Sequence, residues 1–254
     1  MKRISFVLAI IMAIALVLSA CAGQSNKLVV GTSADYPPYE SKDTKTNEFV
    51  GFDMDLIREV GKRIGMQVEI KDMPFDSLIA SVQEGKVDAV IAAMQKSAAR
   101  QEKVDFSDGY HTQVDAFLVK GDSTITMTKP QDAAGLKIGV QTGTLQEQWA
   151  LDNLVPAGVN KDQVIFEYER VDQGALDVAN GRIDTLFINA DPAAELAKNQ
   201  GLKVALVTGE TVAAPQAIAV KKGNTELLNK INTALAAMVQ DGFIKQLQQK
   251  WNIP

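Results

Sequence analysis

Hydrophobic positions along the chain alternate between two spacings. Residues 27–33, 66–70 and 87–93 are short, largely apolar runs rich in β-branched residues, which is typical of buried β-strands. Residues 52–65 and 75–86 place apolar side chains three and four apart, which predicts amphipathic helices, and both stretches reach a glycine that can end a helix. Strands that alternate with helices in this way indicate βαβ units and a mostly parallel sheet.

The second half of the chain repeats this organisation. Residues 171–189, VDQGALDVANGRIDTLFIN, mirror residues 75–93, FDSLIASVQEGKVDAVIAA: in both, an early Asp opens a helical stretch that reaches a Gly and then an Asp just inside a strand. Residues 136–144 likewise resemble residues 28–35. Two matches in the same order predict two similar α/β lobes. Because ligands bind beyond the carboxyl ends of the strands in open α/β sheets, we expect a ligand cleft between the lobes.

Two predicted helices begin where strands should reach this cleft. Ser97 is a good N-cap and is followed three residues later by Arg100, whose planar guanidinium suits a carboxylate. In the second lobe, Thr144 and Glu147 have the spacing of a capping box. Each feature alone indicates only a well-capped helix or a surface charge. Together, two helix N-termini and one arginine favour a small anionic ligand, with a carboxylate as the first choice, and no glycine-rich phosphate loop is present.

The first residues have the features of an export signal. Lys2 and Arg3 precede an apolar run over residues 4–18 that is short for a membrane span, and Leu-Ser-Ala leads to Cys21. This resembles a bacterial lipoprotein signal, in which the peptide is cut before a lipidated cysteine. We therefore expect residues 1–20 to be removed and Cys21 to carry the lipid at the head of a tether over residues 21–27. The alternative is an ordinary secretory signal with a chance cysteine.

Composition excludes several other classes of protein. Loss of Lys2 and Arg3 leaves 24 basic against 31 acidic residues, a charge of −7, and no basic run suggests nucleic-acid binding. The only cysteine is Cys21, so no disulfide or thiolate metal site is expected. No His, Cys or acidic cluster has metal-ligand spacing, and the lone histidine, His111, is predicted to be a strand residue rather than a catalytic base. We expect no metal, no cofactor and no catalytic residue.

Several motifs identify a family. They extend over residues 27–254 and are GTSADYPPYE, FVGFDMDL, PFDSLIASVQEGKVDAVIA, DFSDGY, LKIGVQTGT, GRIDTLF and the tail DGFIKQLQQKW. With them the chain resembles bacterial extracellular solute-binding proteins for polar amino acids, which supply ABC-type importers. The motifs are specific for the family and not for the ligand.

The resemblance implies an architecture and partners. The family fold has two α/β lobes, joined by two hinge strands, that close on a ligand in the cleft between them. We expect residues 28–117 with 219–254 to form lobe 1 and residues 118–218 to form lobe 2, with crossings near 115–121 and 215–223. The resemblance further implies a monomer, anchored by lipid outside the cell membrane (in the periplasm if the organism has two membranes), that delivers a polar amino acid or similar small carboxylated amine to an ABC permease.

The resemblance also implies which residues contact the ligand's α-carboxylate and α-amino groups. Arg100 matches the arginine that clamps the α-carboxylate. The backbone of Ala93 and the side chain of Gln95 match positions that bond the ligand's amino and carboxyl groups. The backbone at Thr144 and Leu145 matches the carboxylate contact of the second lobe.

Further positions concern the ligand side chain. Tyr36 and Phe75 match aromatic or apolar residues that sandwich it, although Tyr36 could simply pack the YPPY turn and Phe75 could contact its own helix. Ser33 and Gln141 lie where selectivity is often set. Ser33, Gln95 and Gln141 favour a polar ligand, whereas Tyr36 and Phe75 would tolerate a flat or aliphatic one.

Three positions depart from the family pattern. Gln95 stands where a small Ser or Thr is usual, and Leu145 lacks the hydroxyl often present there. Asn189 stands where an Asp usually pairs with the ligand's α-ammonium, and an amide oxygen accepts a hydrogen bond without a full charge. Asp191 could supply that charge, or it could simply favour the start of the ADPAAELAK helix. We expect Asn189 to make the direct contact, with Asp191 as the alternative.

Two other functions stay open from the sequence. An enzyme on the same fold, such as a dehydratase for a small carboxylated substrate, would need an acid in the cleft, for which Asp35 and Asp191 are the candidates. A ligand sensor for a signalling receptor would need a partner that this sequence does not contain. Turnover of a substrate would identify the enzyme, and neighbouring genes would separate transport from sensing.

Overall fold

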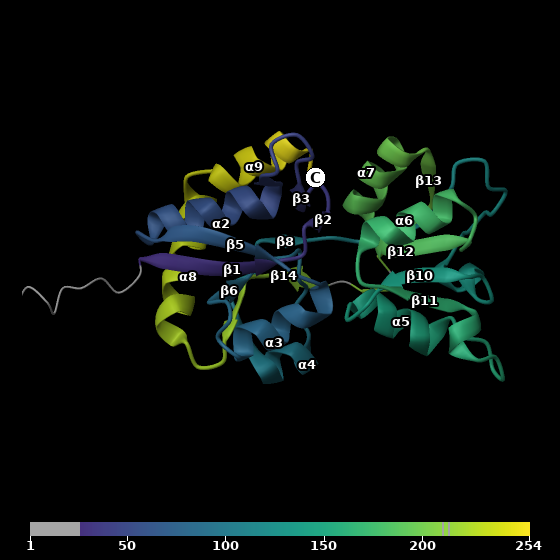
Figure 1. Cartoon of the computed structure of the whole chain (residues 1–254), viewed down its shortest axis with the longest axis horizontal. Coiled ribbons are helices and arrows are strands. Elements are labelled where there is room, and N and C mark those ends of the chain that lie inside the picture. The colour runs from purple at the N-terminus through teal and green to yellow at the C-terminus, as the bar shows by residue number, and fades with distance from the viewer. Residues whose placement is uncertain (1–25, 210, 213) are drawn as a thin grey trace, which may run out of the picture.

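The computed structural model describes residues 26–254 except residues 210 and 213. The chain forms two α/β lobes that lie side by side along the long axis of the molecule (Figure 1). The predicted export signal and the lipidation site at Cys21 fall outside the described residues. The predicted two-lobed α/β fold is therefore confirmed for the part of the chain that the structure describes.

A five-stranded sheet forms the centre of the first lobe. Its order is β5-β1-β6-β15-β7. As predicted, β1 pairs in parallel with β5 and β6, whereas β15 returns from late in the chain and runs antiparallel between β6 and β7. The strands are β1 (Lys27–Thr32), β5 (Gln67–Asp72), β6 (Ala89–Val90), β7 (Val104–Phe106) and β15 (Ala219–Lys221).

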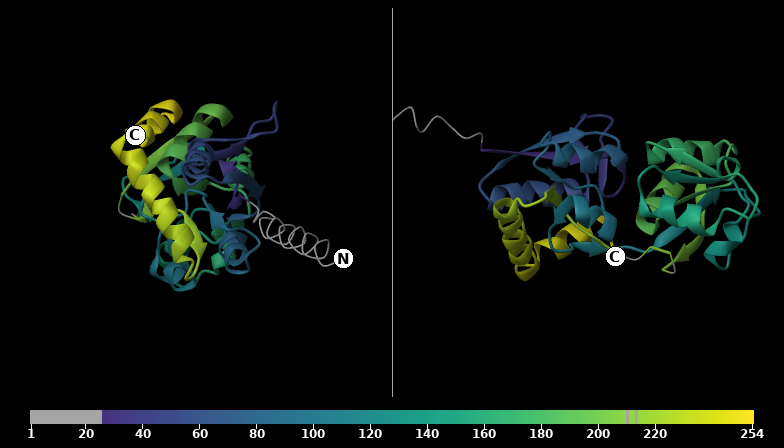
Figure 2. Two further views of the ribbon diagram at one scale, coloured as in Figure 1. Left: turned by 90° about the vertical axis from the view of Figure 1, so that its left-hand side faces the viewer. Right: turned by 90° about the horizontal axis from the view of Figure 1, so that it is seen from below.

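Helices cover both faces of this sheet. In α2, the apolar stripe that includes Leu56, Ile57 and Val60 is fully buried, as its spacing predicts. The two C-terminal helices also belong to the first lobe, which the right-hand view of Figure 2 shows clearly. The helical elements are α2 (Phe52–Arg63), η1 (Phe75–Ser77), α3 (Leu78–Gln83), α4 (Ala98–Lys103), α8 (Thr225–Gln240) and α9 (Phe243–Trp251).

The second lobe has its own five-stranded sheet, with the order β11-β10-β12-β9-β13. The predicted parallel set β11-β10-β12 is extended by two antiparallel strands, β9 and β13. The strands are β9 (Asp115–Lys120), β10 (Ile138–Gln141), β11 (Ile165–Tyr168), β12 (Thr185–Asn189) and β13 (Leu202–Thr208). The helical elements are η2 (Pro130–Ala133), α5 (Leu145–Asn153), η3 (Lys161–Gln163), α6 (Val171–Ala179) and α7 (Ala190–Gln200).

A short antiparallel pair connects the lobes. β8 (His111–Thr112) pairs with β14 (Pro215–Gln216), and β9 follows directly as a full member of the second sheet. We therefore propose to draw the limits of the lobes at the β8–β14 pair, close to the limits that the resemblance implies. A small sheet of β2 (Asp35–Tyr36), β3 (Glu40–Lys42) and β4 (Phe49–Val50) extends the first lobe beside the cleft.

Two predicted elements are shorter in the structure. The helix expected over residues 75–86 begins as the 3-10 turn η1 and ends, as α3, at Gln83. The strand expected over residues 87–93 forms a ladder only at β6, because the chain then leaves the sheet and Ala93 adopts the left-handed conformation with φ of 45°. The Ala93 N–H donates to the Asp53 carboxylate (2.7 Å) instead of a neighbouring strand. This turn brings the segment after β6 to the cleft.

A pair of stacked aromatic rings forms part of the core of the second lobe. Phe117 and Phe187 are fully buried, and their ring centroids lie 4.4 Å apart with planes 11° from parallel.

Among residues 26–254, apart from the two undescribed positions, no helix is long and apolar enough to cross a membrane.

Candidate functional site

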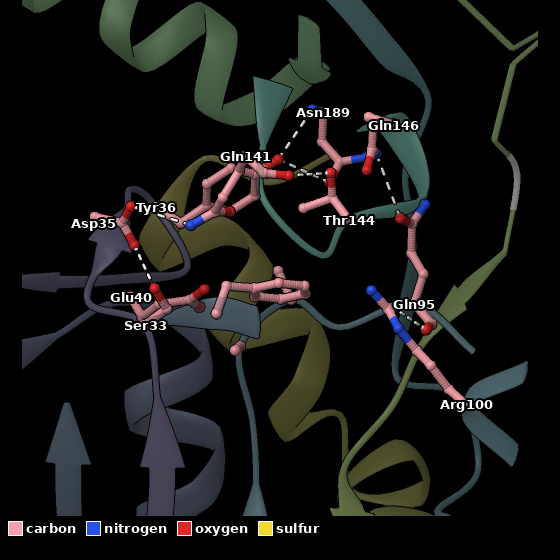
Figure 3. Close-up of a pocket in the computed structure, with 13 residues that line it drawn as sticks. Ser33, Asp35, Tyr36, Glu40, Gln95, Arg100, Gln141, Thr144, Gln146 and Asn189 are labelled. Atoms are coloured by element: carbon pink, nitrogen blue, oxygen red, sulfur yellow. Dashed lines mark hydrogen bonds between the residues drawn. The ribbon is translucent and has the colours of Figure 1, made fainter. Parts of the chain in front are cut away.

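A cavity lies between the lobes, where strand ends and loops of both sheets meet (Figure 3). Its volume is about 20 Å³, which is room for about one water molecule. Direct hydrogen bonds join the lobes around it, so the lobes must separate before an amino acid can enter. The lining residues are Ser33, Asp35, Tyr36, Glu40, Phe75, Ala92, Ala93, Gln95, Arg100, Gln141, Thr144, Gln146 and Asn189.

Most of the residues that the sequence nominates line this cavity. The exceptions are Leu145, which begins α5 beside it, and Asp191, which is the second residue of α7. Sequence reasoning missed Ala92, Glu40 and Gln146 as lining residues. The sequence gave little indication of a role for these three residues. An Ala, a Glu and a Gln at such positions belong to no recognisable motif.

Arg100 reaches from the first lobe to the second. Its side chain is largely buried and donates to the backbone carbonyls of Gln95 (2.6 Å) and Gly143 (2.9 Å). The guanidinium carbon lies 5.3 Å from the ring centroid of Phe75, which is a cation–π geometry. Burial lowers the pKa of Arg100 to about 10, so the group stays cationic at neutral pH. The fork therefore faces the cavity with a full charge and with bonds that a carboxylate can replace.

At the start of α5, opposite Arg100, only one of the two bonds of the predicted capping box forms. The Thr144 hydroxyl accepts from the Glu147 N–H (3.1 Å) and donates to the Gln141 carbonyl (2.6 Å). The Glu147 carboxylate accepts from the N–H of Gly143 (2.6 Å) instead of the N–H of Thr144, which bonds to Gln141. The expected reciprocal capping box is thus shifted by one residue, because the glycine turn presents its own N–H to the carboxylate.

Tyr36 and Asn189 join the lobes on the other side of the cavity. The Tyr36 hydroxyl donates to the Asn189 side-chain oxygen (2.9 Å) and accepts from the Asn189 N–H (3.0 Å). Asp191 faces elsewhere, because its carboxylate accepts from the Tyr39 hydroxyl (2.7 Å) and lies 3.8 Å from the ring nitrogen of His111. Of the two candidates for the ligand amine, only Asn189 faces the cavity.

Asp35 is a first-lobe carboxylate that caps a second-lobe helix. It accepts from the N–H of Val171 (2.5 Å), the first residue of α6, and from Gln141 (3.3 Å) and Ser33 (2.8 Å). Desolvation by burial outweighs these bonds and a nearby Arg170, and raises the pKa of Asp35 to about 6. Closure of the lobes therefore buries this carboxyl group.

Glu40 and Asp53 form a buried acidic pair. Asp53 accepts from the Ala93 N–H and from the Tyr110 hydroxyl (2.8 Å), and burial raises its pKa to about 6. Burial and the neighbouring Asp53 raise the pKa of Glu40 well above its usual range. These two causes favour the protonated form of Glu40, which lines the cavity and has one buried oxygen without a hydrogen-bond partner.

The site contains no grouping of at least three His, Cys, Asp and Glu side chains suited to a metal ion within the described part of the chain. Its chemistry is instead that of recognition: a cationic fork, aromatic rings and buried carbonyl and carboxyl acceptors converge on one cavity between two hinged lobes (Figure 3). The fold and the site together define a two-lobed binding protein for a small polar solute.

Comparison with known proteins identifies the family. Residues 28–253 match the family model of bacterial extracellular solute-binding proteins, family 3, and the chain belongs to this family. It is 33% identical over 246 residues to the arginine-binding extracellular protein ArtP of Bacillus subtilis, covering 92% of each chain. It is 31% identical to the L-cystine-binding protein TcyJ of Escherichia coli, covering 88% of this chain and 82% of that one. An ancestral arginine-binding protein solved with glutamine has 36% identity and a TM-score of 0.82, covering 91% of this chain and 100% of that one.

Proposed function

We propose that the protein is a non-catalytic receptor that captures a polar L-amino acid outside the cell membrane and delivers it to an ABC-type permease. The observation that carries the proposal is the position of Arg100. A buried guanidinium on one lobe faces the cavity between the lobes and already bridges to a backbone carbonyl of the other lobe. A ligand carboxylate that took over these bonds would tie the lobes together, which couples binding to closure.

The ligand's side chain would extend away from Arg100. Figure 3 shows Asp35 and Glu40 on the opposite side of the cavity from the guanidinium, with Tyr36 beside them. A cationic ligand side chain could form ion pairs with these carboxylates. Its charge would lower the pKa of Glu40 and so favour loss of the Glu40 proton. Because two of the similar proteins are also named for arginine, L-arginine is the first ligand to test.

Calorimetry with a panel of L-amino acids tests this function. We expect wild-type protein to bind at least one of them at micromolar concentration or below. Arg100→Ala should weaken binding at least about 100-fold, because two charge-assisted hydrogen bonds are lost. The matched variant Arg100→Lys keeps the charge without the fork and should lie between the two. Undiminished affinity in folded Arg100→Ala would refute the carboxylate clamp.

The absence of catalysis is part of this proposal. The relatives described above are named as binding proteins. The two carboxylates considered as catalytic acids are both engaged: Asp35 caps α6 and Asp191 accepts from Tyr39. Incubation of the panel ligands and of small carboxylated substrates with the protein should give no product by mass spectrometry, and turnover would contradict the receptor assignment.

Attachment to the membrane through Cys21 is likewise proposed, from the residues that precede it. Cells fed radiolabelled palmitate should incorporate label into the wild-type protein and none into Cys21→Ala. Equal labelling of both proteins would show that the lipid is elsewhere. For the transport role, deletion of the gene should reduce uptake of the bound amino acid, and the Cys21→Ala protein should restore uptake poorly because it diffuses away from the permease.

A further inference from the structure

The ligand amine lacks a carboxylate at the position where the family usually has one. Asn189 faces the cavity there, and an amide oxygen carries only a partial negative charge. The structure places the carboxyl group of Asp115 directly behind it. The Asn189 side-chain nitrogen donates to the Asp115 carboxylate at 2.9 Å, across 74 residues of sequence.

Asp115 fixes the orientation of the Asn189 amide. A carboxylate oxygen can only accept a hydrogen bond, so the amide must turn its NH₂ toward Asp115 and its oxygen away from it. That oxygen is the acceptor of the Tyr36 hydroxyl, on the cavity side. Gln146 is oriented in the same way, because its side-chain nitrogen donates to the same Asp115 oxygen at 2.8 Å. Two lining amides are therefore polarised by one carboxylate.

The surroundings of Asp115 fit a charged group rather than a neutral one. Besides the two amides, it accepts from the Thr211 hydroxyl and from the N–H of Val212 (3.0 Å), so all four of these partners are donors. Asp115 is fully buried, and no Lys, Arg or His among the described residues forms an ion pair with it. A buried charge without an ionic partner is costly, and a cation held one amide away would lower that cost.

We propose that Asp115 is the specificity-determining carboxylate for the ligand's α-ammonium, and that it acts through Asn189. In this protein the negative charge lies on Asp115, behind Asn189, instead of at the cavity wall. Asp115 polarises the Asn189 amide, and the amide oxygen accepts the hydrogen bond from the amine. This inference rests on the proposed function, since it assumes an amino acid ligand bound by Arg100 at its carboxylate.

The test exchanges the acid and the amide. Wild type, Asp115→Asn, Asp191→Asn and the double variant Asp115→Asn with Asn189→Asp are titrated by calorimetry. The probes are the tightest L-amino acid of the panel, L-arginine in the first instance, and the analogue in which a hydroxyl replaces the α-amine, argininic acid for L-arginine. Asp122→Asn, an exposed acid of the same lobe, is the control for loss of one negative charge.

We expect Asp115→Asn to weaken binding of the amino acid about 10- to 100-fold and to leave binding of the hydroxy analogue within about threefold. The double variant should regain most of the preference for the amine, because the charge is restored one position forward. Asp122→Asn should behave like wild type. If Asp115→Asn does not fold, the double variant decides: folded protein with a preference for the amine supports the inference, and folded protein without it overturns the inference.

Other results would overturn it. Equal losses for both probes in Asp115→Asn would assign Asp115 a purely structural role. A selective loss in Asp191→Asn, with Asp115→Asn unaffected, would make Asp191 the partner of the amine. If wild type binds amino acids and Asp115→Asn keeps the preference for the amine, the inference fails alone, whereas a wild type that binds no L-amino acid refutes the proposed function and the inference with it.

Discussion

Asp35 should make ligand affinity depend on pH. In the closed structure, this carboxyl group is 6% exposed and has a pKa of about 6, whereas its ordinary value is 3.8. Its partners Val171 and Gln141 belong to the second lobe, so we expect the ordinary value to return when the lobes separate. Closure around a ligand without a cationic side chain therefore takes up a proton at Asp35.

The sign and size of the effect follow from these two values. Because the pKa is higher in the closed form, the favourable contribution is complete below about pH 4 and is lost as the pH rises through about 6. Two-state linkage between 3.8 and about 6 gives roughly tenfold tighter binding at pH 5 than at pH 7.5. At pH 5.5 the same values predict an uptake of about 0.7 proton for each ligand bound.

Calorimetry at pH 5, 6 and 7.5 in buffers of different ionisation enthalpy measures both quantities. The matched variant is Asp35→Asn, in which the side-chain oxygen can still accept from the N–H of Val171 but no proton is exchanged. We expect this variant to bind at pH 7.5 at least as tightly as wild type, and to lose the part of the pH dependence due to Asp35. The other buried acids, Glu40, Asp53 and Asp115, are present in both proteins, and Glu40 is the one whose pKa the Asp35 charge raises. Identical proton uptake in wild type and Asp35→Asn would refute the reasoning.

Three further substitutions test closure and stability. Gly143→Ala should weaken ligand binding about tenfold or more by calorimetry, with a small change in melting temperature. The reason is that φ is +80° and a Cβ would lie 2.9 Å from that of Asp76 on the facing lobe. Unchanged affinity would show that the lobes do not approach this closely. Phe187→Ala should lower the free energy of unfolding by about 3–5 kcal/mol in urea titrations, because it removes a fully buried ring stacked on Phe117; a loss below about 1 kcal/mol would contradict tight packing. Tyr39→Phe should weaken binding about fivefold in the same calorimetric assay through loss of a 2.7 Å hydrogen bond between lobes, whereas a loss of folded protein by circular dichroism would point to a role within lobe 1.

The sequence predicted the architecture because hydrophobic periodicity is a local property. The strand at 27–33 and the helix at 52–65 agree with β1 and α2 to within two residues. The repeated pattern over 171–189 became α6 and β12 of a second sheet. Prediction was least accurate at 87–93, where the alternation continues but the backbone leaves the sheet after β6. A left-handed Ala93 has no signature in the residue pattern, because its conformation depends on the carboxylate that binds its N–H.

For the site, the residue pattern alone was enough to nominate the candidates that carry a motif. Arg100 follows a predicted N-cap, and the Ser97 hydroxyl does accept from its N–H (3.3 Å). Asn189 was recognised as unusual because the resemblance sets an expectation for that position. Which charged groups lie beside these residues became known only from the folded structure. Asp115 reaches Asn189 across 74 residues and Asp35 reaches Val171 across 136, and both contacts form between the ends of strands and helices that only folding brings together. Because the polar groups of a cleft belong to different elements, local pattern can nominate them singly, whereas burial and partners fix their chemistry.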